Sequence, residues 1–92
     1  MVRIKFFPPI AHRANKIEHS ITLDGGMDID DFIRMLRSRP DLASYFERID
    51  NYGRGDNFLR SVIVMVNDRL ADVTIRVNDG DVVKFILPLA GG

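Results

Sequence analysis

The sequence of 92 residues contains no cysteine, which excludes disulfide bonds, thiolate metal ligands and a cysteine nucleophile. It also lacks any apolar run near the roughly 20 residues that a membrane-spanning helix needs. Its first residues lack the apolar segment of a secretory signal. We therefore expect a soluble, cytoplasmic protein with no membrane partner. Any sulfur or thioester chemistry would have to use the end of this chain or a cysteine of a partner.

An excess of either charge is also missing, because 13 basic residues balance 13 acidic ones. Because the sequence has no basic cluster that could bind phosphate groups, we expect no nucleic-acid partner. His12 and His19 stand alone in the sequence, and the acidic group Asp28, Asp30 and Asp31 is better explained by the start of a helix than by a metal. We therefore expect no bound metal.

What the chain does contain is alternating apolar residues, the pattern of strands with one buried face. Pro8-Pro9 ends the first of these segments because proline has no N–H to give to a neighbouring strand. The sequence Asn78-Asp79-Gly80-Asp81 is a strong turn signal before the last segment. Alternation predicts strands over residues 2–7, 17–23, 70–77 (the weakest) and 83–87, and a near-continuous apolar run predicts a further strand over residues 62–66.

Between the second and third strands the apolar period changes to that of a helix. Residues 28–39 carry one apolar stripe, with Asp28 placed to cap the first turn and Pro40 closing the helix. The pattern of residues 41–48 allows a short second helix. Residues 49–60 are rich in glycine, asparagine and aspartate, which predicts a loop that is either a surface insertion or a functional segment.

This order of elements predicts an α+β fold of the β-grasp, ubiquitin-like type. It would have a mixed sheet of four to five strands with the main helix packed on one face. We expect the first hairpin and the final strand to form the middle of the sheet. Residues 1–87 would make up this domain and residues 88–92 a flexible tail.

The tail is the segment on which the functional prediction depends. Pro88 ends the pairing of the last strand, and two glycines leave the final carboxylate unobstructed by any Cβ atom. The last eight residues are Phe85, Ile86, Leu87, Pro88, Leu89, Ala90, Gly91 and Gly92.

Five segments carry a resemblance to a known family: residues 4–7, the helix after Gly26, the strand 62–67, the turn 78–81 and the tail 87–92. Together they resemble the ubiquitin-like sulfur carriers, which comprise the small subunit of molybdopterin synthase, the thiamine-pathway carrier and the related archaeal small modifiers. Two tail positions differ from the molybdopterin synthase pattern. Ile86 replaces an aromatic residue and Leu87 replaces the first of two prolines, whereas the ending Ala90-Gly91-Gly92 is similar to that of the thiamine carrier.

The resemblance implies that this protein is not an enzyme and binds no cofactor. A ubiquitin-activating-like adenylating enzyme would use ATP to activate Gly92, and a sulfur donor protein would convert the adenylate to a thiocarboxylate. The large subunit of molybdopterin synthase, or an equivalent, would then receive the tail. Gly91 and Gly92 would form the reactive end, and residues 85–90 would guide insertion and contact the partner.

Three alternatives stay open at this point. The carrier could serve the thiamine pathway, or Gly92 could be joined to lysines of other proteins as in the modifiers. The chain could also be a β-grasp interaction module whose terminal glycines do not react.

Overall fold

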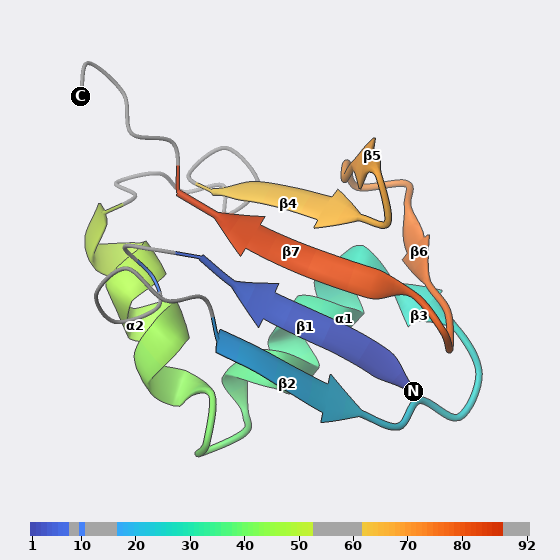
Figure 1. Ribbon diagram of the computed structural model, residues 1–92, viewed down its shortest axis with the longest axis horizontal. Helices are drawn as coiled ribbons and strands as arrows, with labels where there is room; N and C mark the ends of the chain where they lie inside the picture. The colour runs from blue at the N-terminus through green and yellow to red at the C-terminus, as the bar shows by residue number, and fades with distance from the viewer. Residues whose placement is uncertain (8–9, 11–16, 53–61, 88–92) are drawn as a thin grey trace.

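The computed structural model describes residues 1–7, 10, 17–52 and 62–87. Their strands form a five-stranded sheet and a separate two-stranded one, and two helices connect the first hairpin to the later strands (Figure 1). The elements in chain order are β1 (Val2–Phe6), β2 (Ile17–Ile21), β3 (Met27–Asp28), α1 (Ile29–Arg37), α2 (Ala43–Tyr52), β4 (Ile63–Val66), β5 (Arg69–Leu70), β6 (Arg76–Val77) and β7 (Val82–Ile86).

The main sheet has the strand order β2-β1-β7-β4-β5. Strand β7 runs parallel to β1 on one side and antiparallel to β4 on the other, so the last strand occupies the centre. The mixed sheet and its central final strand confirm the predicted β-grasp fold. The expectation that the whole first hairpin lies in the middle is wrong for β2, which forms an edge.

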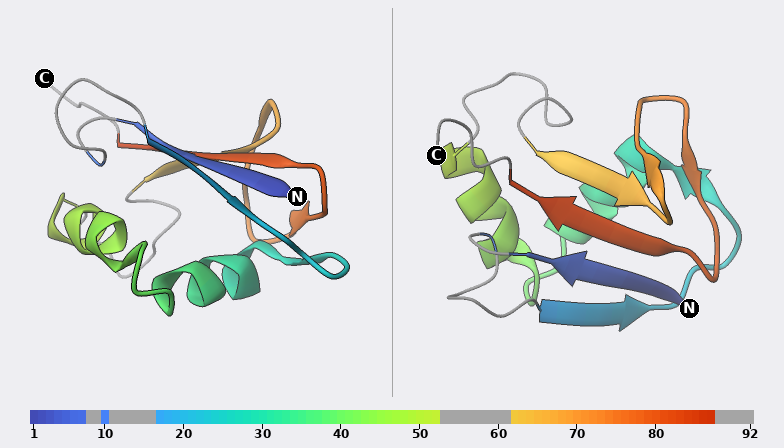
Figure 2. Two further views of the ribbon diagram at one scale, coloured as in Figure 1. Left: turned by 60° about the horizontal axis from the view of Figure 1, so that its bottom comes forward. Right: turned by 45° about the horizontal axis from the view of Figure 1, so that its top comes forward.

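Both helices lie on one face of this sheet, and the opposite face is open in the described part of the chain (Figure 2). Alternate residues of β1 and β7 point toward the helices and are buried, as their apolar period predicts. The core therefore lies between the sheet and the helices. Its contributors include Val2, Ile4, Phe6, Ile29, Phe32, Leu36, Leu42, Phe46, Ile49, Val64, Val83 and Phe85.

Helix α1 begins at Ile29, directly after the predicted cap residue, and ends at Arg37, two residues before the predicted end, while Met27 and Asp28 pair with β6. Asp28 does occupy the N-cap position, but its side chain makes no capping hydrogen bond. Its carboxylate accepts a hydrogen bond from Nη1 of Arg76 at 2.8 Å. The capping role predicted for Asp28 is therefore replaced by an ion pair that joins the two strands of the small sheet.

Two further expectations need correction. Helix α2 continues to Tyr52, so the predicted loop over 49–60 begins with helix, and Ile49 is fully buried in the core. The single strand predicted over 70–77 is instead two short strands, β5 and β6, and the Val73 side chain between them is 64% exposed. The rest of the predicted loop, residues 53–60, lies outside the described residues.

Candidate functional site

The tail continues directly from β7, and this strand is held on both sides to its end. Phe85 lies opposite Phe6 of β1 and Val64 of β4, and Ile86 lies opposite Ile63. The backbone N–H of Phe7 donates to the carbonyl oxygen of Phe85 at 3.1 Å. Because both edges of β7 are paired, the point at which the tail leaves the sheet is fixed by two hydrogen-bonded ladders.

The turn that begins β7 is equally well anchored. Gly80 has a φ of +94°, a conformation that favours glycine, which explains the Asp79-Gly80 signal. The carboxylate of Asp81 accepts hydrogen bonds from the Asn78 backbone N–H at 2.8 Å and from the Asn67 side-chain amide at 3.0 Å. The side-chain oxygen of Asn67 in turn accepts the Val82 N–H at 3.1 Å. These bonds tie the start of β7 to the turn between β4 and β5.

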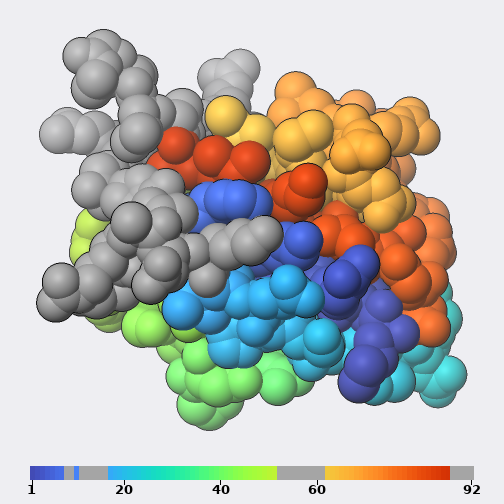
Figure 3. Space-filling model, viewed as in Figure 1, coloured from blue at the N-terminus to red at the C-terminus, as the bar shows by residue number. Residues whose placement is uncertain are grey.

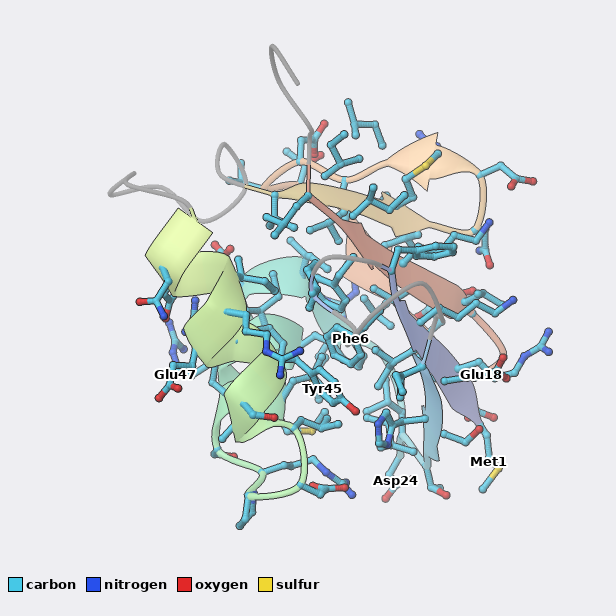
Figure 4. The ribbon with its side chains drawn as sticks, turned by 60° about the vertical axis from the view of Figure 1, so that its left-hand side comes forward. Met1, Phe6, Glu18, Asp24, Tyr45 and Glu47 are labelled. Carbon is cyan, nitrogen blue, oxygen red and sulfur yellow. The ribbon has the colours of Figure 1, made fainter. Side chains whose placement is uncertain are left out.

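An aromatic cluster packs beneath the far end of β7. The Phe85 and Phe6 rings are stacked with centroids 5.2 Å apart, and Phe46 of α2 meets Phe85 edge-on at 5.5 Å. Tyr45 stacks on Phe6 at 4.4 Å, and the two rings lie side by side in Figure 4. Ring pairs in these geometries contribute about 0.5–1.5 kcal/mol each beyond the burial of their area. The cluster therefore fixes α2 against the end of the sheet from which the tail begins.

An ion pair reinforces the position of α2. The guanidinium of Arg37 in α1 donates two hydrogen bonds to the carboxylate of Asp50 in α2, at 2.8 and 2.9 Å, and lies 5.2 Å from the Phe46 ring centroid. The hydrogen bonds from Arg37 hold the pKa of Asp50 below its usual value, and the same contact raises the pKa of Arg37.

The uncovered side of the sheet, which we call the open face, consists of side chains that point away from the helices. Figure 3 views this face, with atoms of β1, β7 and β4 at the surface. Strand register places Lys5 beside Lys84, Lys84 opposite Met65, and Met65 opposite Leu70. Phe7, Ile63, Met65 and Ile86 are half-buried, and Leu70 is 67% exposed. The open face is thus apolar over β4, β5 and the end of β7, with Lys5 and Lys84 near its centre and the charged Arg3 and Glu18 toward the β2 edge.

The structure separates the predicted docking residues into two groups. Phe85 is fully buried and Leu87 is 3% exposed, so these side chains cannot contact a partner while the fold is intact. The side chain of Ile86 reaches the open face. Pro88, Leu89, Ala90, Gly91 and Gly92 lie outside the described residues, so their predicted roles and the flexible tail stay predictions.

Sequence reasoning did not assign the apolar residues of β4 and β5 to a site. The signal that could have found them is strand alternation, because Ile63 and Met65 occupy the positions between the buried Val62, Val64 and Val66. Their assembly with Ile86 depends on β4 pairing with β7, which is a long-range contact that periodicity does not specify.

Two classes of site have no support in the described residues. No group of three or more histidine, aspartate or glutamate side chains there is placed to hold a metal ion. None of the described helices combines the length and the apolar character that a membrane crossing requires.

Comparison with known proteins agrees with this arrangement. The model of the ThiS family matches residues 4–92. One similar solved structure is SAMP1 from Haloferax volcanii, with 18% identity, a TM-score of 0.67 and coverage of 99% of this chain and 98% of that chain. Another is the complex of subunits 1 and 2 of molybdopterin-converting factor from Helicobacter pylori 26695, with 21% identity and a TM-score of 0.53. That comparison covers 99% of this chain and 97% of the other.

No curated protein matches the chain. At these identities the two solved structures establish the fold alone, whereas the family match extends over nearly the whole sequence and includes the Gly-Gly end. The chain therefore belongs to the ThiS family of ubiquitin-like sulfur carriers, which are small carrier proteins.

Proposed function

We propose that this protein carries sulfur as a thiocarboxylate on Gly92 and acts as the small subunit of a molybdopterin-synthase-like complex. The observation that carries the proposal is the family match over residues 4–92, which includes both terminal glycines. The Phe6-Phe7-Pro8-Pro9 opening and the proline at Pro88 favour the molybdopterin route over the thiamine route. The likeness to a complex of molybdopterin-converting factor subunits supports a large-subunit partner.

The chemistry proceeds in three steps. A carboxylate is a poor electrophile, so an adenylating enzyme first joins Gly92 to the α-phosphate of ATP and releases pyrophosphate. A sulfide or a persulfide from a sulfur donor then attacks the acyl carbon and displaces AMP. Sulfide gives the thiocarboxylate directly. A persulfide gives an acyl disulfide with the donor, which a thiol reduces to the thiocarboxylate. The thiocarboxylate sulfur then attacks an electrophilic carbon of the acceptor and displaces a leaving group from it. Hydrolysis of the resulting thioester leaves the sulfur on the acceptor and restores the Gly92 carboxylate. Because the first step uses ATP, we place the cycle in the cytoplasm.

The structure supports this proposal because neighbouring residues of β7 have different roles. Phe85 binds the strand to the core, Ile86 contributes to the open face, and the tail follows within two residues. The apolar part of the open face, over β4, β5 and the end of β7, suits a protein partner, since the cores of protein interfaces are apolar. A partner that docks there would hold the beginning of the tail in a defined position.

The test is activation of the purified chain by the adenylating enzyme of its own organism. We expect ATP–pyrophosphate exchange that depends on this protein. With a sulfur donor added, intact mass should show one oxygen replaced by sulfur, localised to the C-terminal peptide. Deleting Gly92, or adding one alanine after it, should abolish exchange while leaving the thermal unfolding midpoint unchanged.

Val73→Ser provides a matched control, because Val73 is an exposed side chain in the β5–β6 connection near the opposite end of β7 (Figure 1). This variant should be activated like the wild type. Exchange by the Gly92 deletion would overturn the proposal. Isopeptide adducts on lysines, formed without any thiocarboxylate, would instead establish the protein-modifier alternative.

A further inference from the structure

The segment that follows β1 begins beside the last residues of β7. Its sequence is Phe7-Pro8-Pro9-Ile10, and neither proline has a backbone N–H with which to hold the segment in place. The residues on either side of the prolines do have one. The N–H of Ile10 donates to the carbonyl oxygen of Phe7 at 2.9 Å, and the N–H of Phe7 donates to the carbonyl oxygen of Phe85 at 3.1 Å. Two successive hydrogen bonds therefore join Ile10 to β7 close to the point where the tail begins.

Helix α2 holds the other end of this path. Nη1 of Arg48 donates a hydrogen bond to the carbonyl oxygen of Ile10 at 3.0 Å, although the two residues are 38 positions apart in the sequence. Hydrogen bonds from a charged donor are stronger than those between neutral groups. The Ile10 side chain is fully buried, which keeps its carbonyl group near the helix. A continuous path of three hydrogen bonds thus runs from Arg48 through Ile10 and Phe7 to Phe85.

The place of Arg48 in α2 directs its side chain toward this segment. Tyr45 and Arg48 are three residues apart, so they lie on the same side of the helix. Tyr45 stacks on Phe6 at 4.4 Å between ring centroids, immediately before the segment that Arg48 holds. Among the residues that the structure describes, no ion pair includes Arg48, and its side chain is half-buried. Its guanidinium therefore holds backbone of the segment after β1 instead of pairing with a neighbouring carboxylate.

The path bears on the tail because the tail begins so soon after it. Leu87 follows Phe85 by two residues, and Pro88 comes next. Without the hydrogen bond from Arg48, Ile10 would be held only by its side chain and by Phe7, and the hydrogen bond between Phe7 and Phe85 would open more often. The tail would then leave the sheet in a more variable direction. Fewer of the bound carriers would present Gly92 in a reactive orientation, which slows a reaction without weakening binding.

We propose that Arg48 is a positioning residue for the activation of Gly92. By holding Ile10, and through it Phe7, it keeps the hydrogen bond to Phe85 closed and so fixes the direction in which the tail leaves the sheet. This inference rests on the proposed function. Helix α2 packs on the side of the sheet away from the open face (Figure 2), so Arg48 acts on the tail and not on contacts that a partner makes with that face.

The kinetic test compares Arg48→Met with the wild type in ATP–pyrophosphate exchange by the adenylating enzyme of its own organism. Methionine keeps a long unbranched side chain of similar helix propensity and removes the donor with its charge. We expect kcat to fall by about tenfold, while the KM for the carrier, and its Kd measured by calorimetry, stay within about twofold of the wild type.

Amide hydrogen exchange followed by NMR tests the path itself. The amides of Phe7 and Ile10 should exchange about tenfold faster in Arg48→Met, because both N–H groups belong to the path and would be exposed by local opening. The Arg3 amide is an internal control, since it donates to the carbonyl oxygen of Asp81 at 3.0 Å, near the opposite end of the same two strands. Its exchange rate should not change.

Two further variants separate the hydrogen bond from the charge. Arg48→Lys keeps a charged donor, and a single hydrogen bond to a carbonyl does not need the planar fork of arginine. It should return kcat and both exchange rates to within about threefold of the wild type. Arg34→Met is the matched control, because it makes the same chemical change at an exposed side chain of α1 that pairs with Asp31 in the same helix. It should leave kcat, KM and the exchange rates unchanged.

The outcomes distinguish this inference from the proposed function. If the wild type is activated and Arg48→Met retains its kcat, the positioning role is wrong and the carrier function stands. If the wild type is not activated, both fail. A raised Kd with an unchanged kcat would place Arg48 in the contact with the enzyme, and faster exchange of the Arg3 amide would assign it to stability of the whole domain. Either result overturns the inference, as does a variant in which kcat or the exchange of the Phe7 amide changes without the other.

Discussion

Phe85 and Ile86 are neighbours in β7, but their side chains lie on opposite faces of the sheet. Substituting one should therefore affect stability, and substituting the other should affect partner binding. Phe85 is fully buried, with ring contacts to Phe6 and Phe46 at 5.2 and 5.5 Å between centroids. Ile86 is half-buried on the open face. We predict that Phe85→Leu lowers stability but not partner binding, and that Ile86→Thr lowers partner binding but not stability.

The magnitudes follow from the contacts that each change removes. Phe85→Leu loses two ring pairs, each worth about 0.5–1.5 kcal/mol beyond its area, so we expect a loss of about 1–3 kcal/mol. The whole domain should have roughly 5–14 kcal/mol of stability, at about 0.05–0.15 kcal/mol per residue over 92 residues. Ile86→Thr keeps a β-branched residue in the strand, so the unfolding free energy should change by less than about 1 kcal/mol.

Urea unfolding measures the first effect, and the KM for the carrier in ATP–pyrophosphate exchange measures the second. At an m-value of about 1–1.5 kcal/mol/M for a domain of this size, Phe85→Leu should lower the urea midpoint by about 0.7–3 M. Its KM should equal that of the wild type under conditions where both are folded. The reasoning is refuted if Phe85→Leu raises the KM while its midpoint is unchanged, or if Ile86→Thr unfolds like Phe85→Leu.

The remaining predictions concern the ion pair beside the aromatic cluster and the turn that begins β7. Asp50→Asn should lower stability at pH 7 by less than about 1 kcal/mol, because its pair with Arg37 is half exposed. Since the pKa of Asp50 is lowered in the folded state, this stability is present above its unfolded pKa of about 3.9 and is lost as pH falls through the folded value. Unfolding curves of the variant and the wild type should therefore converge as pH falls from about 5 to below 3, and a constant difference would contradict the pairing. Gly80→Ala should cost about 1–2 kcal/mol because φ is +94° there. Gly80→Asn should cost less, and equal losses in thermal unfolding would exclude backbone strain as the cause.

The sequence was sufficient to predict those parts of the fold that depend on local periodicity. The stripe of Ile29, Phe32, Ile33 and Leu36 predicts α1, and all four residues are buried. Alternation likewise predicts β1 and the inward set of β7, and the continuous apolar run of residues 62–66 predicts β4. The Asn78–Asp81 turn was predictable for a local reason, since Gly80 adopts a positive φ.

Long-range contacts account for what the sequence did not reveal. Asp28 has the composition and position of a helix cap, but a guanidinium 48 residues away binds its carboxylate, and no local pattern signals that pairing. The extension of α2 had a weak signal, because Leu42, Phe46 and Ile49 continue one helical stripe. The polar composition after Ile49 obscured it. The residues of the open face could not be assigned from the sequence, because the face combines residues of four strands whose order only the tertiary structure defines.

The geometry of β7 also limits where a partner can place the reacting group. A slip of one residue in either ladder would bring Phe85 to the open face and Ile86 into the core, so the register of β7 is fixed by burial as well as by hydrogen bonds. Five residues follow Leu87, and a chain of that length spans at most about 18 Å when fully extended. On the proposed function, an adenylating enzyme that docks on the open face must therefore present its reacting centre within about that distance of Leu87. The distance between face and centre thus becomes a criterion of specificity, which a carrier with a shorter tail would fail where the centre lies near this limit, even with an identical open face.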